Sequence, residues 1–451
     1  MEKQTKFSIL MFPWLAYSHV FPYLELAKQL SKNKHFHIYF CSSAINLDYV
    51  KKHILSNQSS IELVQLHVPS SPELPPHLHT TKNLPAHLNP ALLRAFQASS
   101  SSFSEILSAI KPDLLIYDFF QPWAPKLALS QNIPSVYFAT SGAAPFSFFH
   151  HLYTHGPSSP FPYPEIYLFD HEKVDIRAKV VEHPVKEADN NYFAFGNFEL
   201  SSEIVLIKSF KGLEDKYINY LSRLCNKKVV PTGPLVAGPD YERDDEGEWL
   251  EIVEWLDAKD RCSTVFVCFG SEHFLPRKQI IEVAKGLEIS GANFIWAVRF
   301  SDEGDELPEG FLERVKGKGM VLPGWAPQGK ILAHPSVGGF VSHCGWSSVM
   351  ESLYFGVPII GVPIKFDQPL NGRLVVEAGA GVEVEKDGNG EFVADEVAKA
   401  IKKVVMEESG ESLRFGAKIL REKMEEEEER AIDEVTDQLL NLCKTKSLIS
   451  S

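Results

Sequence analysis

Residues 325–368 read WAPQGKILAHPSVGGFVSHCGWSSVMESLYFGVPIIGVPIKFDQ, and they predict a strand, a glycine-rich turn and a helix in succession. The strand is expected over the apolar run 338–342, and the helix is expected to begin near Ser348, because residues 349–353 have helical composition. The first amides of a helix lack partners within it and carry the positive end of its dipole, so a phosphate can bind there. This stretch is therefore a candidate anion site.

Side chains around the turn could complete a nucleotide pocket. His343 and Ser348 would add donors for the same anion. Trp325 offers a flat face for a base, and Glu351 offers an acceptor for sugar hydroxyls. A structural alternative stays open, because Ser348 and Glu351 also have the spacing of a capping box, in which each side chain satisfies a backbone amide at a helix start. Trp325 and Trp346 are likewise compatible with buried aromatic side chains.

The same segment resembles the signature box of plant family 1 glycosyltransferases, enzymes that move a sugar from a UDP-sugar to a small acceptor. It has the length of that box, 44 residues, without insertion or deletion, and the resemblance covers essentially the whole chain. The resemblance implies two sets of binding residues. The UDP-binding set is Ser271, Trp325, Ala326, Gln328, His343, Trp346, Ser347, Ser348 and Glu351, and the donor-sugar set is Thr140, Trp346, Asp367 and Gln368.

In this resemblance each region of the donor has its own contacts. Trp325 would stack on uracil, Glu351 would bind the ribose hydroxyls, and His343 with the neighbouring main chain would hold the diphosphate. Gln368 is the variant usually associated with glucose. The chain departs from the pattern at Ser347, where the family usually has asparagine, and the shorter serine lacks the amide donor. A phosphate contact would then be lost or passed to water.

A second constellation lies near the N-terminus. The apolar run 7–12 predicts a strand, residues 23–30 predict a helix, and His19 lies between them. A further strand, expected over 114–117, ends at Asp118. Ligands bind at the carboxyl ends of the strands in an open parallel sheet, so His19 and Asp118 could meet across one crevice.

Sugar transfer to a hydroxyl needs such a pair. Histidine can take the proton of the attacking hydroxyl near neutral pH, and a carboxylate on its other nitrogen fixes the tautomer and stabilises the imidazolium. The surroundings of His19, PWLAYSHVFPYLELAK, and of Asp118, PDLLIYDFFQPWA, resemble the family's catalytic dyad. The resemblance implies that His19 is the general base and Asp118 its partner. Most members have glycine where this chain has Ser18.

Two further positions come from the resemblance. Ser271 follows an apolar run expected to be a strand, and the corresponding serine of the family reaches the diphosphate. Thr140 matches a position that approaches the transferred sugar. Without the resemblance, both are equally well explained as turn residues that satisfy their own loops.

The acceptor is less sharply indicated. Candidate pocket residues are Phe119, Phe120, Trp123, Phe146 and Phe149, each of which could equally belong to the core. The phrases WLAYSH, HLHTT and DFFQPWAP resemble the plant subgroup that extends a sugar already attached to a flavonoid, lignan or terpenoid. We therefore expect an inverting hexosyltransferase that uses UDP-glucose to build a β-linked sugar chain on a glycoside. The alternative is an aglycone O-glucosyltransferase.

Two other functional classes can be separated from this one. A glycoside phosphorylase of similar fold would carry pyridoxal phosphate on a lysine, which an absorbance scan detects. A non-catalytic metabolite carrier would not need both His19 and Asp118. The resemblance implies no bound cofactor and no metal, with UDP-glucose as co-substrate, because helix-end amides and His343 would neutralise the leaving diphosphate.

Composition limits the remaining possibilities. The chain has 451 residues, 44% of them hydrophobic and 23% charged, with a formal charge of −14. Nucleic acid or an anionic membrane would not be attracted to such a surface. The six cysteines lack metal-ligand spacing and indicate reduced thiols in the cytoplasm. No signal peptide is expected, no apolar run approaches the roughly 18 residues of a membrane span, and we expect a monomer.

The fold class follows from length, pattern and resemblance. A chain of this length exceeds one hydrophobic core, so two domains are expected. We predict an α/β protein with two facing Rossmann-like domains, the glycosyltransferase B fold, and an active site in the interdomain cleft. The acceptor domain is predicted over 1–235, a Pro/Gly-rich and acidic linker over 236–250, and the UDP-sugar domain over 251–425. A helix over 426–451 is expected to pack back on the first domain.

Overall fold

The computed structural model of the chain describes residues 6–54, 60–82, 84–156, 158–176, 196–238, 246–270, 274–300 and 306–449. The backbone forms two compact units. The first unit consists of Met1–Ser158, Pro184–Leu235 and Glu426–Ser451, and the second consists of Ser159–His183 and Val236–Glu425. The chain therefore passes from the first unit to the second twice and returns twice.

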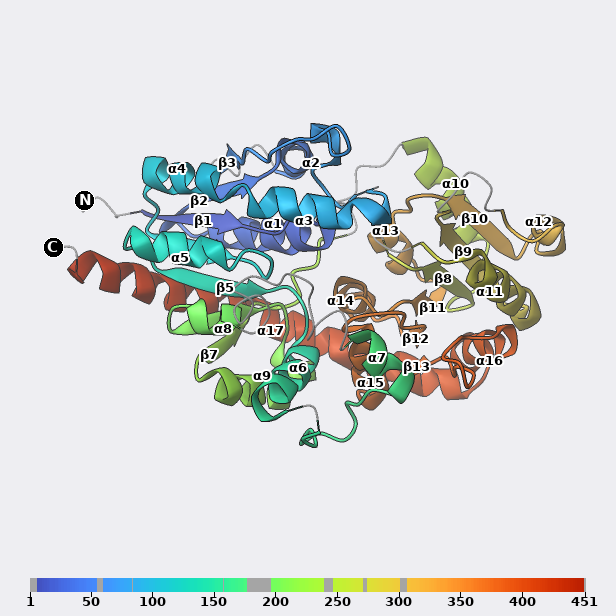
Figure 1. Cartoon of the computed structure of the whole chain (residues 1–451). Helices are drawn as coiled ribbons and strands as arrows, with labels where there is room; N and C mark the ends of the chain where they lie inside the picture. Colours follow the sequence, from blue (N-terminus) through green and yellow to red (C-terminus); the bar gives the residue numbers. More distant parts are fainter. Residues whose placement is uncertain are drawn as a thin grey trace. The chain divides into compact units, whose positions relative to one another are not determined.

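The first unit is built on a parallel sheet with the strand order β3-β2-β1-β4-β5-β6-β7 (Figure 1). The strands are β1 (Phe7–Phe12), β2 (Phe36–Ser42), β3 (Ile61–Gln65), β4 (Leu114–Tyr117), β5 (Ser135–Ala139), β6 (Ile204–Ile207) and β7 (Lys228–Pro231). Because helices cover a parallel sheet, its strands are short apolar runs, and all four residues of β4 are buried. The strand order reverses between β1 and β4, which makes their carboxyl ends the expected ligand position.

Helices connect these strands in sequence. They are α1 (Tyr17–Ser31), α2 (Ala44–His53), α3 (Asn89–Gln97), α4 (Ser100–Ile110), α5 (Trp123–Ser130), α6 (Ala143–His155), α8 (Gly196–Leu200) and α9 (Lys211–Cys225), with short 3-10 turns at Pro76–Leu78 and Ala86–Leu88. The long helix α17 (Ser409–Ile449) contributes its C-terminal part to this unit. Val435, Leu439 and Leu442 of α17 belong to the same hydrophobic core as Ile9, Met11 and other residues of the sheet.

The second unit contains another parallel sheet, with the order β10-β9-β8-β11-β12-β13. Its strands are β8 (Thr264–Cys268), β9 (Asn293–Val298), β10 (Gly319–Pro323), β11 (Val337–Ser342), β12 (Ile359–Gly361) and β13 (Gly381–Glu383). The order reverses between β8 and β11. The chain segments that follow these two strands therefore meet where a ligand is expected.

The helices of the second unit include one from the middle of the chain. They are α7 (Asp170–Ile176), α10 (Glu246–Asp257), α11 (Arg277–Ser290), α12 (Phe311–Arg314), α13 (Gln328–Leu332), α14 (Trp346–Tyr354), α15 (Gln368–Glu377), α16 (Ala394–Val405) and the first part of α17. Because α10 begins at Glu246, the last part of the predicted linker is helical. The two parallel sheets with their connecting helices confirm the predicted α/β class with two Rossmann-like domains.

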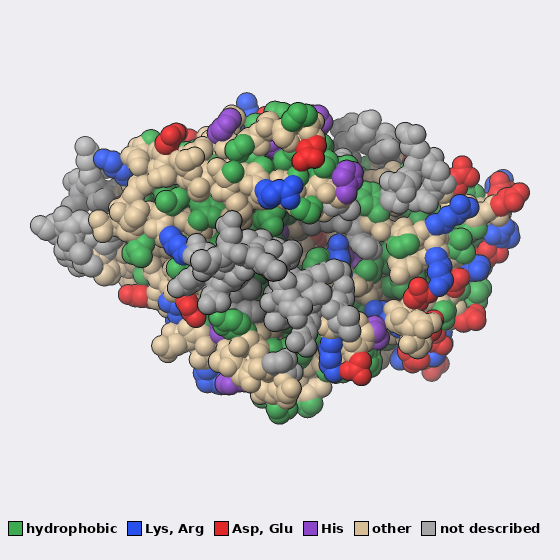
Figure 2. All heavy atoms as spheres, in the orientation of Figure 1, with side chains coloured by type: hydrophobic (Ala, Val, Ile, Leu, Met, Phe, Trp, Pro, Cys, Tyr) green, Lys and Arg blue, Asp and Glu red, His purple; other side chains and the backbone are tan. Residues whose placement is uncertain are grey.

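The surface and the cysteines can now be described from the structure. Among the described residues, no helix is long and apolar enough to cross a bilayer. Figure 2 shows one face of the molecule, on which Lys and Arg side chains are interspersed with Asp and Glu. All six cysteines lie in the described residues and none forms a disulfide, and burial strongly raises the pKa of Cys41 and Cys344.

Candidate active site

His19 and Asp118 lie together at the switch point of the first sheet. His19 lies in the first turn of α1, which follows β1, and Asp118 directly follows β4, the neighbouring strand. His19 Nδ1 is 2.8 Å from Asp118 Oδ2. The Asp118 side chain is fully buried, whereas the His19 side chain is 20% exposed. The structure therefore brings the predicted base and its predicted partner into direct contact, with the imidazole open to solvent on one side.

Backbone amides fix the carboxylate in this position. Trp14 N–H donates to Asp118 Oδ2 at 2.9 Å, and Phe119 N–H donates to Oδ1 at 2.6 Å. An ionised carboxylate can only accept, so the proton shared with His19 belongs to Nδ1 and the acceptor lone pair of the neutral ring is on Nε2. Gln121, which the sequence analysis did not single out, ties the same loop to β1 by donating to the Phe12 carbonyl at 2.6 Å. A neutral His19 ring with its proton on Nδ1 and its lone pair on Nε2 is the tautomer that general-base catalysis requires.

Thr140 joins the pair from a third strand. It follows β5, and its Oγ1 lies 3.1 Å from His19 Nδ1. Three residues later α6 begins, and its first amides, Ala143 N–H and Ala144 N–H, donate to the carboxylate of Glu214 at 2.9 and 2.7 Å. The Thr140 hydroxyl therefore contacts His19 and lies three residues before an anchored helix start.

Glu214, which sequence reasoning missed, supports the start of α6. It is completely buried on α9 and also accepts a hydrogen bond from Ser209 Oγ at 2.5 Å. Burial raises its pKa to about 7, in opposition to the three hydrogen bonds that favour the charged form. A signal was present in the sequence, because Glu214, Tyr217, Ile218 and Leu221 share one helical face and the other three are apolar.

The donor segment has the predicted strand, turn and helix, with one correction. Helix α14 begins at Trp346, with Gly345 as its N-cap, which is two residues before the predicted start near Ser348. Ser348 lies inside the helix and is 8% exposed, so the capping-box alternative is wrong. Glu351 instead accepts a hydrogen bond from Gln328 Nε2 at 2.7 Å, which joins α13 to α14.

The two tryptophans of this segment differ in environment. Trp346 is 4% exposed and packs in the interior, as the structural alternative proposed. Trp325 is 47% exposed, so its ring can be covered by a ligand. Ala326 beside it is buried, while Ser347 is half-buried in the first turn of α14. The exposed indole is the one that the resemblance assigns to uracil.

His343 lies at the switch point of the second sheet. It follows β11, and its ring is enclosed by glycines on two sides. A Cβ on Gly270, which follows β8 with φ +80°, would lie 2.6 Å from His343 Cε1, and a Cβ on Gly345 would lie 2.5 Å from Nε2. Both glycines are therefore needed for this ring position. Ser271, the next predicted residue, lies outside the described residues.

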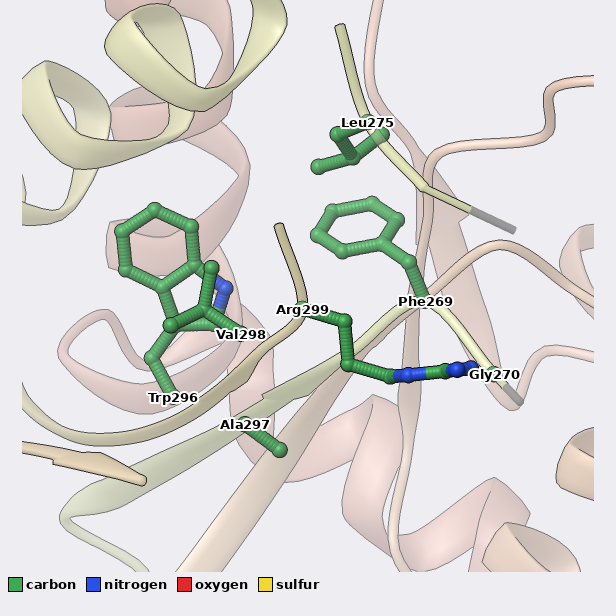
Figure 3. A pocket seen from close by; sticks show the side chains of 7 residues that line it. All are labelled: Phe269, Gly270, Leu275, Trp296, Ala297, Val298 and Arg299. Atoms are coloured by element: carbon green, nitrogen blue, oxygen red, sulfur yellow. The ribbon is translucent and has the colours of Figure 1, made fainter. Parts of the chain in front are cut away.

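A small hollow opens beside the same turn, at the carboxyl ends of β8 and β9 (Figure 3). It is lined by Phe269, Gly270, Leu275, Trp296, Ala297, Val298 and Arg299. In Figure 3 the Arg299 side chain extends toward Gly270, and its guanidinium carbon lies 4.5 Å from the centre of the Phe274 ring. The positively charged Arg299 side chain therefore lies at the end of the second sheet where Gly270 follows β8.

Asp367 and Gln368 open helix α15. Gln368 is 6% exposed, and its Oε1 accepts the amides of Ile364 and Lys365 at 3.0 and 2.9 Å. With Oε1 occupied by these two amides, the NH₂ group is the part of the Gln368 side chain that can donate hydrogen bonds to a ligand. Asp367 Oδ2 accepts from Asn371 Nδ2 at 3.1 Å. Both predicted sugar-binding side chains are thus oriented by their own loop and helix.

The predicted acceptor residues divide into two groups. The Phe120 ring lies 5.8 Å from the His19 ring, and Phe119 contacts both Phe120 and Phe146, so the three rings form a continuous row that begins at His19. Trp123 packs against Phe12, Phe96 and Phe103 at 5.5–5.8 Å, which places it in the interior aromatic packing. Phe149 is buried beside Phe148. Within the described part of the chain, no group of three His, Cys, Asp or Glu side chains has the arrangement of a metal site.

Comparison with known proteins adds an independent line of evidence. Residues 246–413 match the family model described as UDP-glucoronosyl and UDP-glucosyl transferase. The chain is 51% identical over 437 residues to mogroside IIIx synthase of Siraitia grosvenorii, covering 95% of this chain and 96% of that protein. It is 46% identical over 439 residues to beta-D-glucosyl crocetin beta-1,6-glucosyltransferase of Gardenia jasminoides, covering 96% and 98%.

A solved structure supports the architecture. The fold is similar to that of Glycyrrhiza uralensis UGT73P12, crystallised with glycyrrhetinic acid 3-O-monoglucuronide, with a TM-score of 0.83 over 99% of this chain and 97% of that one. The sequence identity is 24%, so this likeness concerns the fold.

Proposed function

The chain belongs to the UDP-glucoronosyl and UDP-glucosyl transferase family, and from this premise we propose that it transfers glucose from UDP-glucose to a sugar hydroxyl of a plant glycoside. The observation that carries the proposal is the contact of His19 Nδ1 with Asp118 at the switch point of the first sheet. A carrier would have no need of a buried carboxylate aligned on an accessible imidazole. The transfer of a sugar from a UDP-sugar is the activity of the family; the residue roles and the two substrates are our proposal.

The reaction proceeds in one displacement. His19 Nε2 accepts the proton of the acceptor hydroxyl as its oxygen attacks the anomeric carbon of the donor. The bond between that carbon and the β-phosphate oxygen breaks, UDP leaves, and the α-linked sugar becomes a β-glycoside. Asp118 stabilises the imidazolium that forms, and it stays ionised throughout. The two amides that donate to Asp118 keep the carboxylate aligned before the substrate arrives.

The second unit holds the donor by complementary groups. The exposed Trp325 ring stacks on the uracil, the Ala326 main chain reads the base edge, and Glu351, braced by Gln328, accepts the ribose hydroxyls. The first amides of α14 and His343 face the diphosphate and stabilise the charge that develops on it as it leaves. At Ser347, serine replaces the amide donor usual in the family, so water completes that phosphate contact.

A glycoside acceptor is supported by the relatives. The Gardenia jasminoides protein is named as a beta-1,6-glucosyltransferase of beta-D-glucosyl crocetin, and this chain is 46% identical to it across nearly its full length. The half-buried aromatic side chains Phe119, Phe120 and Phe146 near His19 would contact the apolar aglycone while the sugar hydroxyl meets the base. We also propose a cytoplasmic location, which is supported by the absence of disulfides among the six cysteines.

A paired-acceptor assay tests this proposal. The protein is incubated with UDP-glucose and with matched aglycones and monoglycosides of flavonoids and terpenoids, and the products are analysed by mass and linkage. We expect glucose to be added to the monoglycosides, with a β-linkage between two sugars. Reaction with aglycones alone would assign the chain as an aglycone O-glucosyltransferase instead.

A further inference from the structure

A segment from the first half of the chain is part of the second unit. Ser159–His183 belongs to that unit, although the chain before and after it belongs to the first. We call residues 159–176, the described part of this segment, the clip. The clip carries Tyr167, Phe169 and, on α7, Glu172, and all three contact one side chain, Arg373 of α15.

The clip encloses the Arg373 guanidinium. Arg373 Nη2 lies 2.9 and 3.0 Å from the two carboxylate oxygens of Glu172. The centres of the Tyr167 and Phe169 rings lie 4.7 and 4.9 Å from its Cζ, within the range of cation–π contacts. The Phe169 amide in turn donates to Glu172 Oε2 at 2.8 Å, which fixes the carboxylate. Charge and ring faces together make a specific socket for arginine.

The ion pair in the socket is buried and its charges are balanced, whereas the Tyr167 and Phe169 rings are partly exposed. The side chains of Arg373 and Glu172 are 4% and 5% exposed. Glu383 Oε1 lies 3.5 Å from Arg373 Nη2, and Lys386 Nζ lies 3.9 Å from Glu172 Oε1, so two cations meet two carboxylates. Burial raises the pKa of Glu383 and lowers that of Lys386. Such a cluster adds little net stability, but removing one member leaves a buried charge unpaired. Its effect is to fix where the clip and α15 meet.

Two residues before Arg373, helix α15 is also attached to the turn formed by residues 343–345, which follows β11. Asn371 Nδ2 donates both to the Cys344 carbonyl at 3.0 Å and to Asp367 Oδ2 at 3.1 Å. A Cβ on Gly372 would lie 3.5 Å from Cys344 Sγ and from Glu383 Oε2, so the turn and the socket both approach the helix closely. A shift of Arg373 along the socket would therefore carry the start of the helix with it.

We propose that Glu172 is a positioning residue for the donor sugar, which acts through Arg373 to set the position of α15 and of the Asp367 and Gln368 side chains at its start. This inference rests on the proposed function, in which those two side chains bind hydroxyls of the transferred sugar. The contacts assigned to the nucleotide, Trp325 and Glu351, lie on other elements. We therefore expect the clip to act on the sugar end of the donor, whose proposed contacts lie at the start of α15, more than on the uridine end.

The test compares UDP-glucose with UDP in the full-length protein. Glu172→Gln removes the charge but keeps the shape, and Lys173→Gln is the matched control, because Lys173 is an exposed neighbour on α7 that pairs only locally with Asp170. Affinities for both ligands are measured by titration calorimetry. We expect Glu172→Gln to weaken UDP-glucose about 5- to 10-fold, consistent with the loss of one or two hydrogen bonds, with UDP binding unchanged. Lys173→Gln should change neither affinity.

Other outcomes separate the alternatives. An equal weakening of UDP and UDP-glucose would mean that Glu172 is merely structural, and unchanged affinities for both would likewise overturn the inference. Phe169→Leu, which removes one ring of the socket without changing charge, provides the same comparison if the Gln variant does not fold. Asp367→Asn is measured in parallel: if it leaves UDP-glucose affinity unchanged, the sugar-site assignment of the proposed function fails, whatever Glu172→Gln does.

Discussion

Asp118 Oδ2 accepts hydrogen bonds from both His19 Nδ1, at 2.8 Å, and the Trp14 amide, at 2.9 Å. One fully buried oxygen thus links the imidazole to the backbone that follows β1. The ring orientation is set before any substrate binds, and the tautomer is set with it. This contact defines what each partner contributes to the reaction.

Replacing Asp118 with asparagine should reverse the tautomer of His19. The amide NH₂ would donate to Nδ1, so the proton would move to Nε2 and the ring could no longer accept one from the acceptor hydroxyl. We expect kcat to fall by about 10³- to 10⁴-fold, as for other bases that lose their orienting carboxylate. Initial rates with saturating UDP-glucose measure this, and UDP affinity serves as the control. A fall of less than ten-fold would contradict the role of Asp118.

Replacing Trp325 with alanine should weaken nucleotide binding without destabilising the protein. The ring is 47% exposed, so little packing is lost, while a stacked base contributes roughly 1–3 kcal/mol. UDP affinity should fall by about 10- to 100-fold. Trp346→Ala is the contrasting variant, because that ring is buried and its loss should cost about 3–5 kcal/mol of stability. Normal UDP binding by Trp325→Ala would remove the assigned uracil platform.

Replacing Gln368 with histidine should weaken the use of UDP-glucose relative to other UDP-hexoses. Gln368 Oε1 accepts two loop amides, which aims its NH₂ group as a fixed donor, and an imidazole cannot reproduce both functions. We expect the ratio of kcat/KM for UDP-glucose to that for UDP-galactose to fall by about ten-fold. An unchanged ratio would remove the basis for naming glucose as the donor sugar.

Glu214 should make stability depend on pH. Its pKa is raised from 4.5 to about 7 by burial, so the folded protein binds more protons than the unfolded chain between these values. The wild-type protein should therefore lose stability, on the order of 3 kcal/mol, as the pH rises from 4.5 through 7. Glu214→Gln should lack this loss, and urea unfolding at pH 5 and pH 8 measures the difference. Glu105→Gln, an exposed residue of α4, should behave as wild type.

Much of the fold could be predicted from the sequence, because buried parallel strands consist of short apolar runs. The predicted strands over 7–12 and 114–117 agree with β1 and β4, and that over 338–342 is one residue shorter than β11. The start of α14 was placed two residues late, because Gly345 and not a serine caps it. The local pattern of residue types predicts strands well. It predicts the start of a helix less well when the N-cap is glycine, because glycine has no side chain that would mark the cap.

Polar contacts between residues far apart in the chain could not be predicted from the sequence. Glu172 and Arg373 are 201 residues apart, and each by itself resembles an ordinary surface charge. Only the folded chain brings them to one buried socket. Gln368 was predicted to contact sugar from the family pattern, but its second function, holding the amides of residues 364 and 365, depends on a loop conformation that composition does not specify. Burial and partner choice are tertiary properties, which a pattern of residue types does not contain.

The most direct test of the central claim is His19→Ala, with turnover and UDP affinity measured on the same preparation. The imidazole is the proposed proton acceptor and does not contact the nucleotide in the proposed mechanism. We expect turnover to fall by at least about 10³-fold while UDP affinity stays within two-fold of wild type. Retained turnover, or loss of UDP binding together with activity, would contradict it.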